Sequence, residues 1–469
     1  MSDANRKTTD DRAAAMSRRD FLKVSEGVAL AGASANLAWL DGAAAAPAAT
    51  PDAAPARWKP AEPPNEPIGE AQGILPGRVV WIHDPEVAQW DGDKATGGWF
   101  EDRFTSAALA ESMLSRTLRL VTGATTDADA WAALFRHYNQ THGRGTVGYR
   151  PGEKVAVKLN LNCSTSRQAE TKHGSYNTPQ LTMALLRQLV RQAGVRESDL
   201  VVYDASRFVN DSIFLPAHAE FPGIRFEDRD GGDGRFAVQP DRNVALHFGD
   251  PSTPDHGKTF LPACVTGATY LVNASVFKGH SLAAVTLATK NHFGSVFRDD
   301  PGPRDPHKGW NPSHMHESIM VRKRPMGTYN ALVDLLAHKD LGGKTIFYLI
   351  DAFYATPHQS VLPEKWQSSP FDGHWTSSVF ASQDPVALES VAVDFFAAEA
   401  TAKLTIGAVD NYLHEAALAH QPPSGIRYDP AGDGTPPRSL GVHEHWNRSD
   451  RKQYSRNLGT GMGIELVKG

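Results

Sequence analysis

The sequence predicts an α/β fold of three layers, with a mainly parallel β-sheet, helices on both faces and long loop insertions. Apolar, β-branched runs of strand length alternate along the chain with stretches of helical spacing, which is typical of doubly wound sheets. No proline-rich linker interrupts the body of the chain, so we expect a single domain. A chain of 469 residues with 41% hydrophobic and 22% charged residues is long enough to bury the core that such a fold needs.

The individual elements follow from these patterns. Strands are expected at residues 78–83, 154–161, 200–203, 224–227, 270–276, 344–350 and 377–381. Helices are expected at residues 107–120, 127–142, 179–193, 329–338 and 385–400, and between Ser281 and Lys290. Thr178 followed by Pro179 is typical of a helix start, because threonine caps the first turn and proline suits its first position. Residues 231–257 and 299–324 have turn chemistry and little periodicity, which is typical of long insertions.

The N-terminus has the pattern of an export signal. Residues 17–23, SRRDFLK, resemble the twin-arginine (Tat) motif, and the apolar stretch at residues 28–40 is too short and too rich in Gly and Ala to span a membrane. We predict a signal peptide at residues 1–46, an Ala/Pro-rich linker at 47–76 and one α/β domain at 77–469. The expected partner is the Tat machinery and the expected location is the periplasm, without a membrane anchor after processing. The alternative is an ordinary basic tail.

Charge and cysteine content exclude several classes. A net charge of −5 does not suggest a nucleic-acid partner. Two cysteines, Cys163 and Cys264, exclude a disulfide scaffold and a four-cysteine iron–sulfur or zinc site within the chain. We expect two free thiols, because cysteines near strand ends behave mainly as small buried residues.

Polar residues follow five of the predicted strands. They are Asn160, Asp204, Lys278 with His280, Asp351, and Asp384. In a parallel sheet these positions would share one edge, the edge at which open α/β sheets bind ligands. The alternative is that each caps a helix or turn, above all Asp204 and Asp384, the latter because Pro385 follows it.

Three lysines indicate what such a site would bind. Lys158 lies within an apolar strand and needs an anion there, either a carboxylate such as Asp204 or a ligand. Together with Lys278, Lys290 and the amides of Asn160 and Asn291, it would suit a small carboxylate or phosphate ligand. The chain has neither of the common glycine-rich phosphate loops and no G-x-S-x-G elbow, which argues against nucleotide binding and against an α/β-hydrolase.

Two histidine pairs raise the question of a divalent metal. His314 and His316 lie two residues apart, as do His443 and His445. This spacing places both rings on one face of an extended segment, and Asp351 or Asp384 could complete a mixed site. The alternative is loop histidines that bond to backbone groups.

Several of these stretches resemble the family called domain of unknown function 362 (DUF362). The resemblance covers about residues 154–400 and is strongest at residues 270–294, where K-x-H and T-x-x-x-K-N-x-x-G are met by residues of this chain. These residues are Lys278, His280, Thr286, Lys290, Asn291 and Gly294. Some members carry ferredoxin-like cysteine clusters, which this chain lacks, so the resemblance implies no iron–sulfur chemistry here. The family name implies no particular reaction.

The leading hypothesis is an exported enzyme that acts on a small anionic or polyhydroxy substrate at the carboxyl edge of the sheet. Lys278 and Lys290 would stabilise negative charge and His280 would be the general acid or base. The alternative is a periplasmic binding or carrier protein that uses the same residues without catalysis. A third hypothesis is a purely structural polar network.

Overall fold

The computed structural model describes residues 58–60, 62–168, 176–253, 258–299, 309–310, 313–402 and 408–469. The proposed signal peptide, part of the proposed linker, part of the insertion at residues 299–324 and the side chain of His314 lie outside this description. The described residues belong to one unit, Arg57–Gly469. None of their helices is long and apolar enough to cross a membrane.

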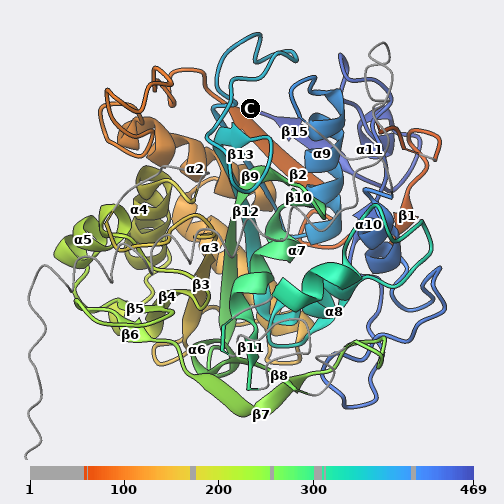
Figure 1. The fold of residues 1–469 in the computed structure, drawn as a ribbon, viewed down its shortest axis with the longest axis horizontal. Coiled ribbons are helices and arrows are strands. Elements are labelled where there is room, and N and C mark those ends of the chain that lie inside the picture. Colours follow the sequence, from red (N-terminus) through yellow and green to blue (C-terminus); the bar gives the residue numbers. More distant parts are fainter. Residues whose placement is uncertain are drawn as a thin grey trace, which may run out of the picture. The chain divides into compact units, whose positions relative to one another are not determined.

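A ten-stranded sheet forms the centre of this unit (Figure 1). Its strands, in spatial order, are β15 (Glu465–Lys468), β2 (Arg78–His83), β13 (Ser378–Ser382), β12 (Thr345–Thr356), β9 (Tyr270–His280), β3 (Val155–Leu159), β4 (Leu200–Asp204), β5 (Arg225–Asp228) and β6 (Phe236–Ala237), with β10 (Ala284–Thr286) paired to β9. Along the main order only β13 is antiparallel to its neighbours. The sheet is therefore mainly parallel, as predicted.

Helices cover both faces of the sheet, which confirms the three-layer prediction (Figure 1). One face carries α2 (Ala107–Thr122), α3 (Asp127–Thr141), α4 (Pro179–Arg187), which continues as a π-helix at Gln188–Gln192, and α5 (Asp211–Glu220). The other carries α8 (Ala331–Ala337), α9 (Pro385–Ala398) and α10 (Asn411–Ala417). The residues of β9 alternate between the two cores, with Val272 in the first and Leu271 in the second, as the period of a strand requires.

Smaller elements complete the unit. They are a sheet of β7 (Pro240–Leu246), β8 (Thr259–Pro262) and β11 (Phe297–Arg298), the short helices α6 (Ala263–Thr266), α7 (Ala288–Asn291) and α11 (Ser455–Leu458), and a pair of β1 (Ile68–Gly69) with β14 (Val442–His443). The β1–β14 pair corrects the predicted boundary at residue 77. Residues 62–76 include part of the fold, because β1 needs the backbone of β14 to satisfy its hydrogen bonds.

The segment after β9 differs from the sequence prediction. No helix begins at Ser281. Instead β10 turns back along β9, which places Thr286 opposite Lys278, and the single turn of α7 follows, continued by a 3-10 turn at His292–Ser295. Alanine and leucine favour a helix here, but pairing with the buried strand outweighs that local preference.

Candidate functional site

The carboxyl ends of β3, β4 and β9 bring together most of the residues that the sequence singled out. Lys158 is completely buried, and its ammonium donates to Asp204 Oδ2 at 3.1 Å and to Asn291 Oδ1 at 3.1 Å. Asn291 in turn donates to Asn273 Oδ1 at 2.9 Å, on β9. This group ties α7 to two central strands.

Asp204 is fully satisfied by protein groups. It accepts from Lys158, from the backbone N–H of Leu161 and from both the N–H and the hydroxyl of Ser206. Burial alone would raise the pKa of Asp204, but the charge of Lys158 and these N–H groups together hold it below its ordinary value. Lys158 and Asp204 therefore form a buried ion pair that joins the ends of β3 and β4 at the site.

Lys278 and Lys290 lie on the other side of this pair. Lys278 is completely buried and donates to Asn160 Oδ1 at 2.9 Å. Burial lowers the pKa of Lys278 to about 8. Burial, followed by the charges of Lys278 and Arg207, holds the pKa of Lys290 well below its ordinary value.

The surroundings of Lys290 contain no counter-charge within the described residues. Its ammonium lies 3.4 Å from His316 Nε2 and 4.0 Å from the centre of the Phe293 ring, and no described carboxylate is within ion-pair distance. Lys290 is 8% exposed and His280 is 7% exposed, whereas Lys158 and Lys278 are closed off entirely. Lys290 and His280 are therefore the members of the group nearest the protein surface, and Lys158 and Lys278 lie deeper.

His280 has a fixed orientation. Its Nδ1 accepts hydrogen bonds from the backbone N–H groups of Leu282 at 3.1 Å and Ala283 at 3.2 Å, at the turn of the β9–β10 hairpin. Since Nδ1 is the acceptor, the hydrogen of the neutral ring is on Nε2. Burial, and then the charge of Lys290, lower the pKa of His280 well below its ordinary value, which keeps the ring neutral.

The loop that follows β12 also contacts the site. Gln359 accepts at its side-chain Oε1 from the Ser281 N–H and at its backbone oxygen from the thiol of Cys163, both at 2.9 Å. Both described cysteines are free thiols, as the sequence predicted. His358, next to Gln359, acts electrostatically on His280.

Sequence reasoning missed Arg207, His316 as a neighbour of His280, and His358. Arg207 directly follows Ser206 after β4, so the strand-end argument would have found it had it been carried one residue further. The ring of His316 stacks on that of His280 at 5.3 Å between centroids. His358 was hidden because β12 extends to Thr356, six residues beyond the predicted strand end.

Asp351 and Asp384 serve as helix caps. Asp351 lies at the carboxyl edge, but its Oδ2 accepts from the N–H and hydroxyl of Thr178 at the start of α4; burial raises its pKa to about 6. Asp384 caps α9 and also accepts from the N–H groups of Gln72 and Val442; burial raises its pKa to about 7. Because β13 is antiparallel, Asp384 lies at the opposite edge of the sheet from Lys278, which corrects the expectation of a single shared edge.

A cavity of about 220 Å³ lies near that opposite edge, around Thr345 and Gln383. None of the predicted site residues lines it. The chemistry-bearing residues and this cavity are therefore separate features.

The predicted histidine sets do not form one metal site. His316 lies beside Lys290 and His280, whereas His443 and His445 lie with Asp410 in the C-terminal part of the unit. Asp410, His443 and His445 offer ligand atoms that are all within 4.8 Å of one another, and Glu62 and His414 form a second such group with Asp410. Neither Asp351 nor Asp384 belongs to a ligand group among the described residues.

Fold and site together define an α/β protein with a buried cationic site at the carboxyl edge of a mainly parallel sheet. The model of a protein family, described as a domain of unknown function (DUF362), matches residues 155–394, just over half of the chain. The chain belongs to this family, which confirms the resemblance seen in its sequence. The match covers every strand that contributes to the cationic site. A search of curated proteins finds no match to the chain.

Proposed function

We propose that this protein is an exported enzyme that binds a small anionic substrate among Lys278, Lys290, Arg207 and His280 and stabilises the negative charge that develops on it. The observation that carries the proposal is the buried Lys290, which has no described carboxylate within ion-pair distance. Burying an amine in this way depresses its pKa, and a carboxylate or phosphate would restore the proton. Export through the Tat pathway to the periplasm is part of the proposal and is supported by residues 17–23.

The chemistry of the site favours catalysis over simple storage. A neutral imidazole with its hydrogen on Nε2 is a hydrogen-bond donor to a developing oxyanion and is poorly placed as a base. A lysine whose pKa is depressed by burial and that gains its proton together with the anion is, by contrast, a competent general acid. In this mechanism Lys278 and Arg207 hold the anionic group, the ammonium of Lys290, which is protonated as the anion binds, donates its proton to the substrate, and the Nε2–H of His280 stabilises the oxygen on which charge accumulates. The alternative remains a carrier that uses the same cations for binding alone.

The test is calorimetric titration of the purified protein with inorganic phosphate and with oxalate, in buffers of different ionisation enthalpy. Because burial lowers the pKa of Lys290 in the free protein and a bound anion raises it again, anion binding by the wild type should be accompanied by proton uptake at neutral pH. Affinity should fall as the pH rises, since each binding event then needs a scarcer proton. Lys290→Met should lose the proton uptake and bind roughly 10- to 100-fold more weakly, the loss of a charge-assisted hydrogen bond.

Lys339→Met is the matched control, because Lys339 is an exposed lysine whose side chain is 63% accessible. This control makes the same Lys-to-Met change as Lys290→Met and should bind like the wild type. If Lys290→Met keeps both the wild-type affinity and the proton uptake, the anion does not bind at Lys290 and the proposal is wrong.

A further inference from the structure

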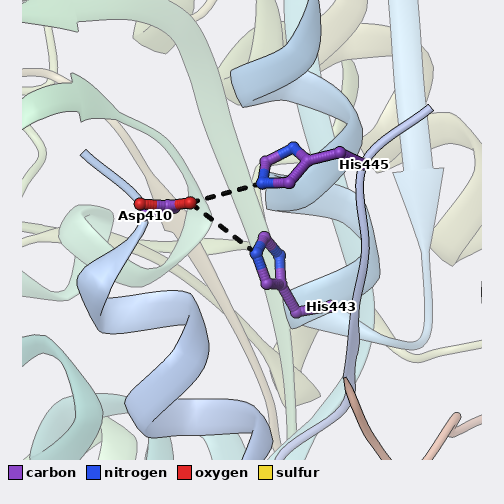
Figure 2. Close-up of side chains that lie close together, drawn as sticks. All are labelled: Asp410, His443 and His445. Atoms are coloured by element: carbon purple, nitrogen blue, oxygen red, sulfur yellow. Dashed lines mark hydrogen bonds and ion pairs between the residues drawn. The ribbon is translucent and has the colours of Figure 1, made fainter. Parts of the chain in front are cut away.

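A second group of titratable side chains surrounds Asp410. These residues lie far along the chain from those of the proposed anion site. His443 and His445 lie on and just after β14, and both rings are turned toward Asp410, which precedes α10 (Figure 2). His445 Nε2 lies 3.3 Å and His443 Nε2 lies 3.9 Å from Asp410 Oδ2. All three side chains are at least 97% buried.

The hydrogen bonds on the far side of the His443 ring fix its tautomer. Ser390 lies on α9, and its hydroxyl donates to the backbone oxygen of Val386 at 2.7 Å. A hydroxyl has a single hydrogen, so Ser390 must accept in its contact with His443 Nδ1, which also measures 2.7 Å. The ring hydrogen of His443 is therefore on Nδ1. The lone pair of His443 thus resides on Nε2, the atom that faces Asp410.

His443 Nε2 has no hydrogen-bond partner among the described residues, although the ring is only 1% exposed. A buried nitrogen lone pair without a donor costs roughly 1–3 kcal/mol. A second proton on His445 would explain its contacts with Asp394 and Asp410 as an ion pair. It would leave His443 Nε2 unexplained.

His445 is also held through its Nδ1, by a carboxylate instead of a hydroxyl group. Its Nδ1 lies 2.6 Å from Asp394 Oδ1, and Asp394 is itself held by the N–H of Trp446 and the hydroxyl of Tyr454, both at 2.9 Å. A histidine whose second nitrogen bonds to an anchored carboxylate is the usual support of a metal-ligating imidazole. Both histidines are therefore oriented from behind with Nε2 turned to a common point.

We propose that Asp410, His443 and His445 bind one divalent transition-metal ion of the zinc class. Two imidazole nitrogens and a carboxylate oxygen are ligands that Zn²⁺ accepts at about 2.0–2.2 Å, which places neighbouring tetrahedral ligands about 3.4 Å apart. The separations of 3.3 and 3.9 Å are close to that value. An ion there would also supply the missing partner of His443 Nε2.

The position of the group indicates a structural role for the ion. It joins the segment at β14 to the start of α10 and, through Ser390 and Asp394, to α9, which packs on the central sheet. Glu62 and His414 lie 3.3 Å apart, and both belong to a second ligand group with Asp410. Through Glu62, the N-terminal segment of the unit reaches the same place. The ion would thus hold together segments that are more than 30 residues apart in the chain.

The test is loading of the full-length protein with Zn²⁺ and with Co²⁺, followed by elemental analysis and visible spectroscopy after removal of free ions. We expect one ion per chain, the intense visible bands of Co²⁺ in a low-coordinate site, and a higher melting temperature with Zn²⁺. His443→Gln should lose the ion. Ser390→Ala, which leaves all three ligands in place, should weaken Co²⁺ binding roughly 10- to 100-fold and covers the case in which His443→Gln fails to fold.

Two controls place the ion. His338→Gln changes another fully buried histidine outside the group, and His316→Gln changes the histidine beside Lys290. Both should keep the ion. Wild-type protein that takes up neither metal, or that loses it in His316→Gln while His443→Gln retains it, would overturn the proposal.

Discussion

At the scale of single residues, His280 shows how the backbone selects a role. Its Nδ1 is engaged by two backbone N–H groups, so the ring can offer Nε2–H to a ligand but cannot easily accept a proton there. The sequence suggested a general acid or base. The geometry favours a hydrogen-bond donor, and in the proposed mechanism it is Lys290 that transfers the proton.

Two substitutions separate these functions of the ring. In His280→Asn the amide oxygen replaces Nδ1 at the turn, and Nε2 is lost. In His280→Gln the amide nitrogen approximates Nε2, and the acceptor at the turn is lost. We expect His280→Asn to keep a melting temperature close to that of the wild type but to bind phosphate at least tenfold more weakly. His280→Gln should retain more of the affinity but lose roughly 1–3 kcal/mol of stability, the cost of unsatisfied buried groups.

Equal losses of affinity in both variants, with unchanged stability, would contradict this assignment. Once a substrate is identified, the same pair distinguishes an enzyme from a carrier. In an enzyme His280→Asn lowers turnover more than affinity, and in a carrier only affinity changes.

Residue chemistry was the most predictable part of the site. A lysine inside an apolar strand required an anion, and the structure supplies Asp204 to Lys158 as the sequence suggested. Asp351 was less predictable, because a carboxylate that caps a helix and one that binds a ligand follow a strand in the same way. Only the position of Thr178 in space distinguishes the two.

At the scale of elements, the β9–β10 hairpin determines the site. It folds Lys290 back toward Lys278 and His280, whereas the predicted helix would have carried Lys290 about two and a half turns away. The sequence could not reveal this, since the alternation that marks a short strand is hidden in a run of Ala, Leu and Val. The hairpin also requires close packing, because Gly279 lies against the backbone oxygen of Pro357.

Gly279→Ala tests the hairpin as an element. A Cβ there would come within 2.0 Å of Pro357 O, which is backbone and cannot rotate away. We expect a loss of about 1–3 kcal/mol in the free energy of unfolding and a lost or strongly reduced thermal shift with phosphate, because Lys278 and His280 flank the displaced residue. Chemical denaturation and thermal melting with and without phosphate measure both effects.

Gly148→Ala is the control, because a Cβ there meets nothing within 4 Å. It should change stability by less than about 0.5 kcal/mol and leave the phosphate shift intact. A Gly279→Ala protein with wild-type stability and a wild-type shift would show that the hairpin does not position the site.

At the scale of the whole molecule, the fold class was predictable and the sheet order was not. Periodicity identified the strands and their alternation with helices, but the direction of β13 depends on its pairing with the preceding strand β12 and with β2, which is distant in sequence. The same applies to β1 and β14, whose pairing brings segments from the two ends of the unit together. Such long-range pairings join the unit into one cooperative body, and both proposed sites depend on it.

This dependence bears on export, because the Tat route carries proteins that have already folded. We expect the double substitution Arg18→Lys and Arg19→Lys to retain the protein in the cytoplasm, folded and with the wild-type melting temperature, since the motif does not belong to the unit Arg57–Gly469. Fractionation of cells followed by immunoblotting, with protease resistance as the measure of folding, gives both results.

Arg6→Lys with Arg12→Lys is the matched control, because it makes the same chemical change in the same N-terminal stretch but outside residues 17–23. This control should reach the periplasm normally. If the Arg18 and Arg19 variant also reaches the periplasm at the wild-type level, the pair does not direct export, and the proposed location must be abandoned while the anion site and the metal site stand on their own tests.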